Sequence, residues 1–212
     1  MNRDENITAV ILAAGRSSRM GMLKPLLPLG RETVIERVIH IFRSAGIPDI
    51  LVVIGHEAER LTPLLKKQLV RWVINKNYEE GMFSSVQAGV KRLHQCSRAF
   101  FLHPVDIPLI RVETLRKLMD AFRKGKADIY RPCYQGKRGH PPLIAPVLAP
   151  YILDFKEPGG LRSLLSRHEE RSLDVECDDP GVLKDLNTPE EYEEMQQMKI
   201  PYHKLYGTSF HD

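Results

Sequence analysis

Apolar and polar positions follow two alternating patterns over the first 132 residues. Runs of consecutive apolar residues are typical of strands buried on both faces of a parallel sheet, and apolar positions three or four apart are typical of amphipathic helices. The runs predict strands at 7–13, 50–54, 70–74, 99–102 and 128–131. The spaced positions predict helices at 33–45, 57–69, 84–93 and 112–123. Strands that alternate with helices indicate an α/β fold with a mostly parallel central sheet.

The alternation weakens after about residue 133, where prolines divide the chain into short pieces. We expect a helix at 161–167, a strand near 173–177 and a last helix that begins after Thr188. Thr188 is a favourable N-cap, and Pro189 suits the first helical position. Residues 201–212 show no periodicity, so we expect an irregular tail that is either disordered or docked on another subunit.

The first predicted strand runs into a turn that combines glycines with basic side chains. Gly15 and Gly21 can adopt a positive φ and let backbone N–H groups approach phosphate oxygens. Arg16, Arg19 and Lys24 add charge of the matching sign. The turn is therefore a candidate for binding a nucleoside triphosphate; the alternative is an ordinary strand-to-helix loop.

Two other kinds of phosphate loop are excluded by spacing. A P-loop ends in Gly-Lys-Ser/Thr, whereas Gly21 is followed by Met22. A dinucleotide-binding turn needs glycine at the positions that Ser17 and Met20 occupy.

Oxygen-bearing side chains follow two further segments. Asp106 comes just after the buried strand at 99–102, at the sheet end where open α/β proteins bind ligands. Its carboxylate could hold Mg²⁺, or it could cap the turn before Pro108. Asp185 and Asn187 offer further oxygen ligands, although capping of the last helix explains Asn187 almost as well.

Two other segments carry weaker signals. Ser84 and Ser85 stand where a helix is predicted to start, and the spacing favours Ser84 as a simple N-cap over a nucleotide contact. The polar turn at 136–141 contains Arg138 and His140. His140 could carry a proton or donate to an anion, or it could be an ordinary exposed histidine.

Length and composition limit the possible function classes. The 212 residues suffice for one core, and no apolar run approaches the ~20 residues of a membrane span. The first six residues lack the apolar core of a signal peptide, so we expect a cytoplasmic protein. A net charge of +4 is too small to indicate nucleic-acid binding. The three cysteines are far apart, and we expect reduced thiols without a disulfide or a zinc site.

Together these motifs resemble the nucleotidyltransferases that act on the molybdenum cofactor. The resemblance runs in order from about residue 7 to 195 and rests on the segments 12–24, 81–89, 104–109, 138–141 and 185–189. The segments 12–24 and 104–109 are typical of a wider superfamily that includes sugar-phosphate enzymes. The Ala13-Ala14-Gly15 and Arg138-Gly139-His140-Pro141 sequences look closer to its cytidylyltransferase branch than to its guanylyltransferase branch.

The resemblance implies a Rossmann-like, single-domain nucleotidyltransferase fold over residues 1–200, with helices on both faces of the sheet. About 7–132 would bind the nucleotide and about 133–197 would face the acceptor. The implied reaction transfers CMP from CTP to the terminal phosphate of molybdopterin, or of its molybdenum-loaded form, with Mg²⁺ as cofactor and release of pyrophosphate. A molybdoenzyme or its chaperone would be the partner that receives the product, with neither nucleic acid nor membrane involved.

The resemblance also implies roles for individual residues. The implied catalytic residues are Arg19, Lys24 and Asp106. The implied nucleotide contacts are Leu12, Ala13, Ala14, Gly15, Arg16, Gly21, Lys24, Ser84, Ser85 and Gly89. The implied acceptor contacts are Arg138, His140 and Arg162. The implied metal ligands are Asp106 together with Asp185 or Asn187.

Two departures from the family pattern leave alternatives open. Asn187 stands where the cytidylyltransferase branch has an aspartate, and a neutral amide binds Mg²⁺ more weakly. The segment 157–162 keeps Gly160 and Arg162 but lacks the aspartate of a Gly-Asp-x-Gly-x-Arg motif. A transferase that uses GTP, or that acts on a sugar phosphate or another small phosphate, is one alternative. A non-catalytic carrier of a nucleotide or cofactor is another.

Overall fold

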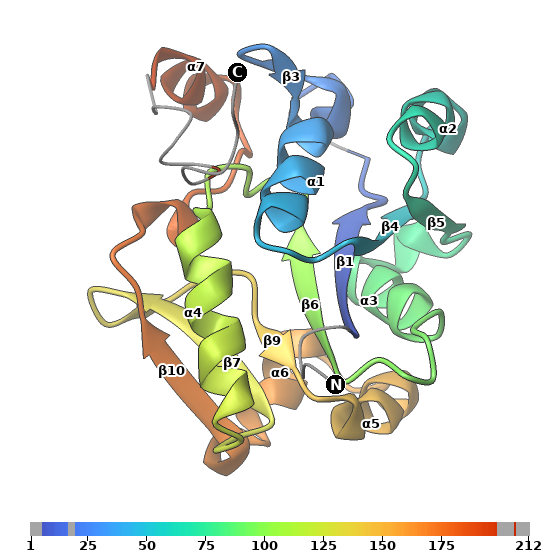
Figure 1. Cartoon of the computed structure of the whole chain (residues 1–212). Coiled ribbons are helices and arrows are strands. Elements are labelled where there is room, and N and C mark those ends of the chain that lie inside the picture. The colour runs from blue at the N-terminus through green and yellow to red at the C-terminus, as the bar shows by residue number, and fades with distance from the viewer. Residues whose placement is uncertain (1–5, 17–19, 199–205, 207–212) are drawn as a thin grey trace.

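A mostly parallel sheet forms the centre of the computed structural model, which describes residues 6–16, 20–198 and 206 (Figure 1). The strand order is β10-β7-β9-β6-β1-β4-β5, and β8 pairs with β7. The strands are β1 (Ile7–Ala13), β4 (Asp49–Ile54), β5 (Arg71–Ile74), β6 (Ala99–Pro104), β7 (Ile129–Tyr134), β8 (Lys137–Arg138), β9 (Leu143–Ile144) and β10 (Ser172–Glu176). Strands β1, β4, β5 and β6 pair in parallel, as do β7 and β10. The predicted α/β class is confirmed.

Helices cover both faces of the sheet, and each face has its own apolar core. The helices are α1 (Val34–Ser44), α2 (Ala58–Lys67), α3 (Met82–Val90), α4 (Val112–Arg123), α5 (Ala149–Asp154), α6 (Gly160–Ser166) and α7 (Pro189–Gln197). Side chains of α1, α2 and α4 share one core, and those of α3, α5 and α6 share the other. Strand β1 serves both cores because its side chains alternate: Ile11 faces the first and Leu12 the second.

Strand β9 is the main departure from the predicted elements. It lies between β6 and β7 and is antiparallel to both, so β6 and β7 are joined through a two-residue strand. The sequence does not indicate β9, because Leu143 and Ile144 are only two apolar residues that follow Pro141 and Pro142. Helix α5 also escaped prediction, because it has only six residues and Pro150 stands in its first turn.

Short elements complete the connections. They are the two-stranded sheet of β2 (Pro28–Leu29) and β3 (Glu32–Thr33) and the 3-10 helices η1 (Lys24–Leu26), η2 (Tyr78–Glu80), η3 (Pro146–Leu148), η4 (Glu169–Arg171) and η5 (Pro180–Leu183). No helix in the described residues is both long and apolar enough to cross a membrane.

One residue of the predicted irregular tail is described, and it docks on its own chain. Tyr206 is 1% exposed, and its hydroxyl donates to Glu32 in β3. In the same region, Tyr192 of α7 donates through its hydroxyl to the Pro28 carbonyl at 2.6 Å. The C-terminal part of the chain therefore packs against the hairpin that follows Lys24.

Candidate active site

The segment after β1 borders a pocket of about 120 Å³ at the carboxyl end of the sheet. The predicted nucleotide residues that line this pocket are Leu12, Ala13, Ala14, Gly15, Lys24 and Ser85, and Asp106 joins them. Gly21 adopts the expected positive φ of +63°. Gly15 lies outside the positive-φ region, so that expectation was wrong. A Cβ there would meet no described atom within 4 Å, so Gly15 supplies space and not an unusual backbone angle.

The structure places Arg16 away from the pocket. Its guanidinium pairs with Glu79 and lies 5.8 Å from the centre of the Tyr78 ring. Both partners precede α3, so Arg16 ties the turn after β1 to that segment in this structure. The other predicted basic residue of the turn, Arg19, lies outside the described residues.

Lys24 is the centre of a polar group formed by three separate segments. Its Nζ donates to Asn187 Oδ1 at 2.8 Å and lies 3.5 Å from Asp106 Oδ2. Asn187 Nδ2 in turn donates to Asp185. The side chains of Lys24 and Asp106 are only 12% and 22% exposed, so solvent screens their attraction weakly. The structure thus brings together four residues that the sequence places up to 163 positions apart.

Close backbone packing holds these segments against each other. A Cβ on Gly139 would lie 2.4 Å from the Val182 carbonyl oxygen, and one on Gly181 would lie 2.1 Å from that of Leu109. Only glycine allows such an approach. The His140 amide donates to the Val182 carbonyl at 2.9 Å. The turn at 136–141 and η5 are therefore fixed beside the loop that carries Asp106.

Burial controls the charge of the Asp106 carboxyl. Desolvation raises its pKa above the usual range, the nearby positive charge of Lys24 lowers it, and the negative charge of Asp185 adds to the rise. A cation bound beside Asp106 would favour its ionised form. The ionisation of Asp106 therefore depends on the positive charge near its carboxyl.

The donor set fits a magnesium ion. Asp106 and Asp185 supply two carboxylates near one hollow, and Mg²⁺ is commonly held by one or two carboxylates plus substrate phosphates. The described part of the chain contains no group of three or more His, Cys, Asp or Glu side chains arranged to enclose a metal. Mg²⁺ held by these two carboxylates would take its remaining ligands from substrate phosphates and water.

The start of α3 differs from the prediction. Its N-cap is Gly81, at a φ of +103°, and the helix begins at Met82, so Ser84 is not the N-cap. The Ser84 hydroxyl donates to the Gly81 and Asn77 carbonyls at 2.8 Å. Glycine at positive φ can turn the chain into the helix without a side-chain cap, which leaves Ser84 inside the first turn.

Asn75, at the end of β5, connects that strand to the serine pair. The residue is buried, and its Nδ2 lies 2.8 Å from Ser84 Oγ and 3.0 Å from Ser85 Oγ. Ser85 lines the small pocket, whereas Ser84 does not. Gly89, also predicted as a nucleotide contact, packs against the sheet, where a Cβ would lie 2.5 Å from Val10 Cγ1. The structure thus gives Gly89 a packing role.

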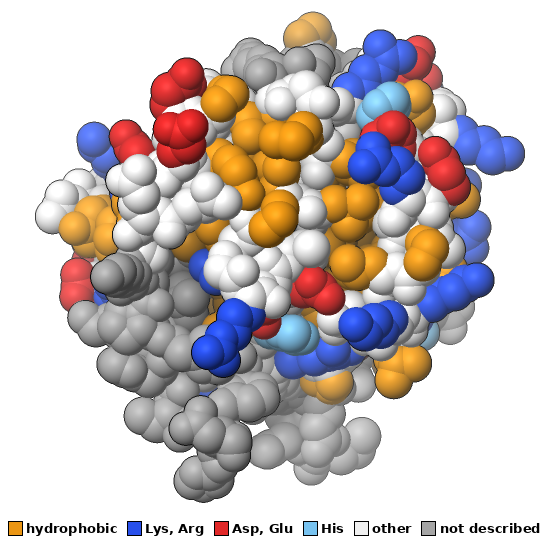
Figure 2. Space-filling view, turned by 90° about the horizontal axis from the view of Figure 1, so that it is seen from above, with side chains coloured by type: hydrophobic (Ala, Val, Ile, Leu, Met, Phe, Trp, Pro, Cys, Tyr) orange, Lys and Arg blue, Asp and Glu red, His pale blue; other side chains and the backbone are white. Residues whose placement is uncertain are grey.

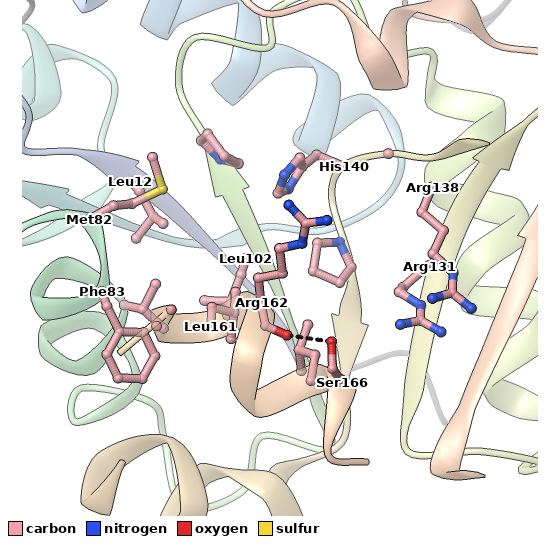
Figure 3. A pocket seen from close by; sticks show the side chains of 17 residues that line it. Leu12, Met82, Phe83, Leu102, Arg131, Arg138, His140, Leu161, Arg162 and Ser166 are labelled. Carbon is pink, nitrogen blue, oxygen red and sulfur yellow. Dashed lines mark hydrogen bonds between the residues drawn. The ribbon is translucent and has the colours of Figure 1, made fainter. Parts of the chain in front are cut away.

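A cleft of about 790 Å³ adjoins the small pocket (Figure 3). It lies between α3, α6 and the turn at 136–141, and all three predicted acceptor residues, Arg138, His140 and Arg162, line it. Arg162 reaches from α6 toward His140 (Figure 3). Much of the remaining wall is apolar: Leu12, Met82, Phe83, Val86, Leu102, Pro104, Pro142, Leu161 and Leu165. No Asp, Glu, Asn or Gln is among the described residues that line the cleft.

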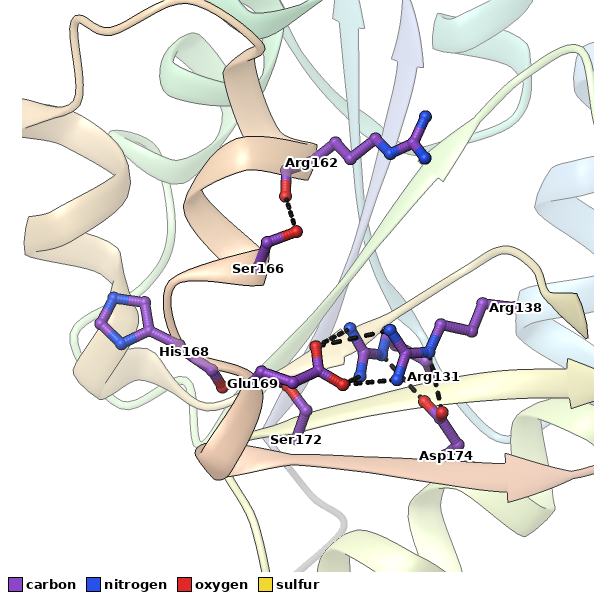
Figure 4. Close-up of polar contacts among 8 residues, drawn as sticks. All are labelled: Arg131, Arg138, Arg162, Ser166, His168, Glu169, Ser172 and Asp174. Carbon is purple, nitrogen blue, oxygen red and sulfur yellow. Dashed lines mark hydrogen bonds and ion pairs between the residues drawn. The ribbon is translucent and has the colours of Figure 1, made fainter.

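Arg138 belongs to a closed charge cluster (Figure 4). Arg131 donates through Nε to Asp174 at 2.9 Å and through Nη2 to Glu169 at 2.9 Å. Arg138 Nε donates to the other Asp174 oxygen at 2.8 Å, and its Nη2 also contacts Glu169. The two arginines lower the pKa of Glu169 to about 2, and the cluster pairs two arginines with two acidic side chains. Arg138 therefore brings little net charge to the cleft.

Arg162 and His140 are the predicted acceptor residues that remain available. Arg162 makes no side-chain hydrogen bond or ion pair with the described residues, and it is exposed. His140 is half-buried, so the alternative of an ordinary exposed histidine was wrong. Burial lowers the pKa of His140, and the negative charge of Asp185 opposes this. Its imidazole is therefore neutral near pH 7.

Seen from above, the carboxyl end of the sheet shows hydrophobic side chains in the middle, with acidic and basic side chains around them (Figure 2). A third hollow, of about 370 Å³, contains His140, Asp106, Asp185 and Asn187. Met82 lines this hollow as well as the small pocket and the cleft. The candidate active site is thus a chain of three adjoining spaces.

Met82, Asn75 and Arg131 are among the residues of the site that escaped prediction. Met82 and Asn75 carry no distinctive sequence signal, because their role follows from where β5 ends and α3 begins. Arg131 does carry a sequence signal, because a charged residue inside a buried strand must be paired.

This fold and this site, with a basic residue and two carboxylates beside a phosphate-sized pocket, define a nucleotidyltransferase-type α/β protein. The chain belongs to the family of the MobA-like NTP transferase domain, whose family model matches residues 9–172. The molybdenum cofactor cytidylyltransferase of Escherichia coli is 26% identical over 187 residues, which cover 88% of this chain and 93% of that protein. The nicotine blue oxidoreductase of Paenarthrobacter nicotinovorans is 27% identical over 194 residues, with 87% and 94% covered.

Solved structures share the fold over nearly the whole chain. A nucleotidyl transferase from Methanothermobacter superposes with a TM-score of 0.77 at 27% identity and covers 91% of this chain and 96% of that one. Rv0371c of Mycobacterium tuberculosis also has a TM-score of 0.77, at 26% identity, with 91% and 98% covered. A further structure of Rv0371c is a complex with manganese. The predicted Rossmann-like nucleotidyltransferase fold is confirmed.

Proposed function

We propose that this protein transfers CMP from CTP to the terminal phosphate of a molybdopterin-type acceptor and releases pyrophosphate. The observation that carries the proposal is the adjacency of two unlike spaces: a small pocket beside Lys24 and Asp106, and a large, mostly apolar cleft with Arg162 and His140. The similarity to the molybdenum cofactor cytidylyltransferase supports the same assignment.

The proposed chemistry needs no strong protein base. A phosphate monoester dianion is already a nucleophile, so one of its oxygens can attack the α-phosphorus of CTP once the two are aligned. The bond from that phosphorus to the bridging oxygen breaks, and pyrophosphate leaves with the electron pair. Lys24, held beside the small pocket, neutralises the charge that grows on the leaving group.

Asp106 and Asp185 are the residues that would hold Mg²⁺ in this proposal. The ion, when bound, supplies positive charge that offsets the phosphate oxygens. The manganese complex of Rv0371c supports a divalent cation in a protein of this fold.

The apolar wall of the cleft supports a flat ring system as the body of the acceptor. Its leucines and Phe83 suit the faces of a heterocycle. Arg162 and the imidazole of His140 would then bind the phosphate at the inner end of the acceptor.

The test is pyrophosphate release with CTP, GTP, ATP and UTP, each measured with molybdopterin and with a panel of sugar phosphates. We expect turnover with molybdopterin and a preference for CTP. A preference for GTP would overturn the cytidylyl assignment, and turnover only with a sugar phosphate would overturn the acceptor. Nucleotide binding without any pyrophosphate release would instead indicate a carrier protein.

A further inference from the structure

The side chain of His103, near the end of β6, closes the turn that carries Asp106. The Ile107 amide donates to the Pro104 carbonyl at 3.3 Å, so residues 104–107 form a β-turn with Asp106 at its third position. His103 Nε2 lies 3.0 Å from the carbonyl oxygen of Ile107. One side chain therefore joins the strand that enters the turn to the residue that leaves it.

The imidazole of His103 is held in one tautomer and one orientation. Burial lowers its pKa to about 3, so the ring is neutral near pH 7 and carries a single N–H. A carbonyl oxygen can only accept, so this hydrogen is on Nε2, which donates to Ile107. Phe42 of α1 packs edge-on against the ring, with the two centroids 5.4 Å apart and an interplanar angle of 72°.

An imidazole is a costly choice at this position. His103 is fully buried, and its Nδ1 has no hydrogen-bond partner among the described residues. A buried acceptor without a partner costs free energy, and the adjacent strand residues Phe101 and Leu102 are apolar, so packing alone does not call for a histidine. What the imidazole adds to this core is one donor, and the turn of Asp106 receives it.

The same turn is bonded to two other segments of the site. The Val105 amide donates to the Leu12 carbonyl of β1 at 3.1 Å, and the Leu186 amide donates to the Asp106 carbonyl at 2.7 Å. The Asp106 carboxylate lies 3.5 Å from Lys24 Nζ and borders the small pocket. A change in the path of the turn would therefore move this carboxylate relative to Lys24 and to the pocket.

We propose that His103 is a positioning residue, which fixes the turn at 104–107 so that the Asp106 carboxylate stays beside Lys24 at the small pocket. Because the ring is fully buried, it acts only through the turn. The inference rests on the proposed function only in taking Asp106 as a cation-binding carboxylate.

Matched amide substitutions separate the hydrogen bond from the packing. Glutamine Nε2 is as many bonds from the backbone as histidine Nε2, whereas asparagine Nδ2 corresponds to histidine Nδ1. His103→Gln therefore keeps a donor within reach of the Ile107 carbonyl, and His103→Asn does not. In metal-free hydrogen exchange we expect the Ile107 and Leu186 amides to exchange about tenfold faster in His103→Asn than in His103→Gln. The control is His94→Asn, which changes an exposed histidine and should leave both amides as in the parent.

Binding of Mn²⁺ alone, followed by electron paramagnetic resonance, gives a second readout. We expect His103→Asn to weaken the affinity by about tenfold, as for loss of a group that orients a metal ligand, and His103→Gln to bind within about twofold of the parent. Thermal unfolding of each variant accompanies the titration. Both amides bury a polar group in the core, so a loss caused by instability would appear in both variants.

Parent-like exchange and affinity in His103→Asn, or a His103→Gln variant that does no better than His103→Asn, would overturn the proposal. If His103→Asn does not fold, His103→Leu repeats the comparison with a side chain that matches its apolar neighbours. Failure of both to fold would assign the hydrogen bond to the stability of the fold and would also overturn the proposal.

Neither readout uses CTP or an acceptor, so the proposal can fail while the proposed function holds. If Asp106→Ala binds Mn²⁺ as the parent does, the cation site of the proposed function is wrong. The exchange of the turn amides still decides the role of His103 in that case.

Discussion

At the residue scale, the sequence identifies the charged groups of the site but not their partners. Lys24 and Asp106 stand out because each follows a buried strand with turn residues around it. The contact of Lys24 with Asn187 cannot be seen in the sequence, since it depends on how the loop at 184–188 returns to the sheet. Arg138 shows the reverse case: its sequence suggests an anion-binding group, yet Asp174 and Glu169 neutralise it.

Removal of Lys24 or Asp106 is expected to affect turnover directly. We expect Lys24→Ala and Asp106→Ala each to lower the rate of pyrophosphate release by on the order of a hundredfold, as for loss of one preorganised electrostatic contact. The control variant is Lys66→Ala, which removes an exposed lysine from α2, outside the site, and should leave the rate unchanged. Near-normal rates in either site variant would refute the role assigned to that residue.

His103 is expected to make the protein less stable in acid. It is fully buried in β6, donates through Nε2 to the Ile107 carbonyl at 3.0 Å, and burial lowers its pKa from 6.5 to about 3. The unfolded chain therefore binds a proton that the folded protein excludes, and the free energy of unfolding falls as the pH drops below 6.5 toward 3. For one group the slope approaches about 1.4 kcal/mol per pH unit.

Urea unfolding between pH 4.5 and 7 measures this contribution. We expect His103→Leu, which also removes the buried and unpartnered Nδ1, to flatten the pH dependence relative to the parent. An identical slope in both proteins would show that other groups cause the acid sensitivity.

At the element scale, prediction succeeded where a segment was long and periodic. Helix α4 begins and ends where its pattern does, and α1 has the capping box that Thr33 and Glu36 allow. It failed where one or two residues decide the outcome. The N-cap of α3 is Gly81 and not Ser84. Which of the two residues caps the helix depends on the direction in which the chain leaves η2, and the local sequence does not specify that direction.

The contact between the turn at 136–141 and η5 yields a prediction about folding. Gly139→Ala should destabilise the protein by about 1–3 kcal/mol. The added methyl group would meet the Val182 carbonyl, which is part of the backbone and cannot move aside. Gly15→Ala is the matched change at a glycine with space around it and without a positive φ, and it should be near neutral in stability. Chemical unfolding compares the two variants; equal stabilities would mean that η5 shifts freely.

At the scale of the whole molecule, the sequence predicts the fold class but not the strand order. Local patterns do not specify which strands are neighbours, and the insertion of β9 between β6 and β7 depends on pairing between distant segments. The large cleft could not be predicted from the sequence for the same reason. Its walls come from segments that meet only after the second half of the chain has packed against the first.

Tyr206 offers a test of how far the C-terminal segment contributes to the stability of the whole. Tyr206→Ala should cost about 3–5 kcal/mol, the usual effect of removing a large buried aromatic side chain. Tyr206→Phe keeps the ring and removes the hydroxyl that donates to Glu32, and should cost about 1–3 kcal/mol. Urea unfolding measures both, and a parent-like stability of the alanine variant would mean that the tail is dispensable.

Met82 has a further consequence for how a product could leave. The residue is 63% exposed and borders all three spaces of the site. An unbranched thioether changes rotamer easily, so the partition it forms is deformable. In the proposed reaction the dinucleotide product would lie across that partition, with one half on each side. The size of this one side chain would then affect how the two halves of the product share the site and how the product leaves it.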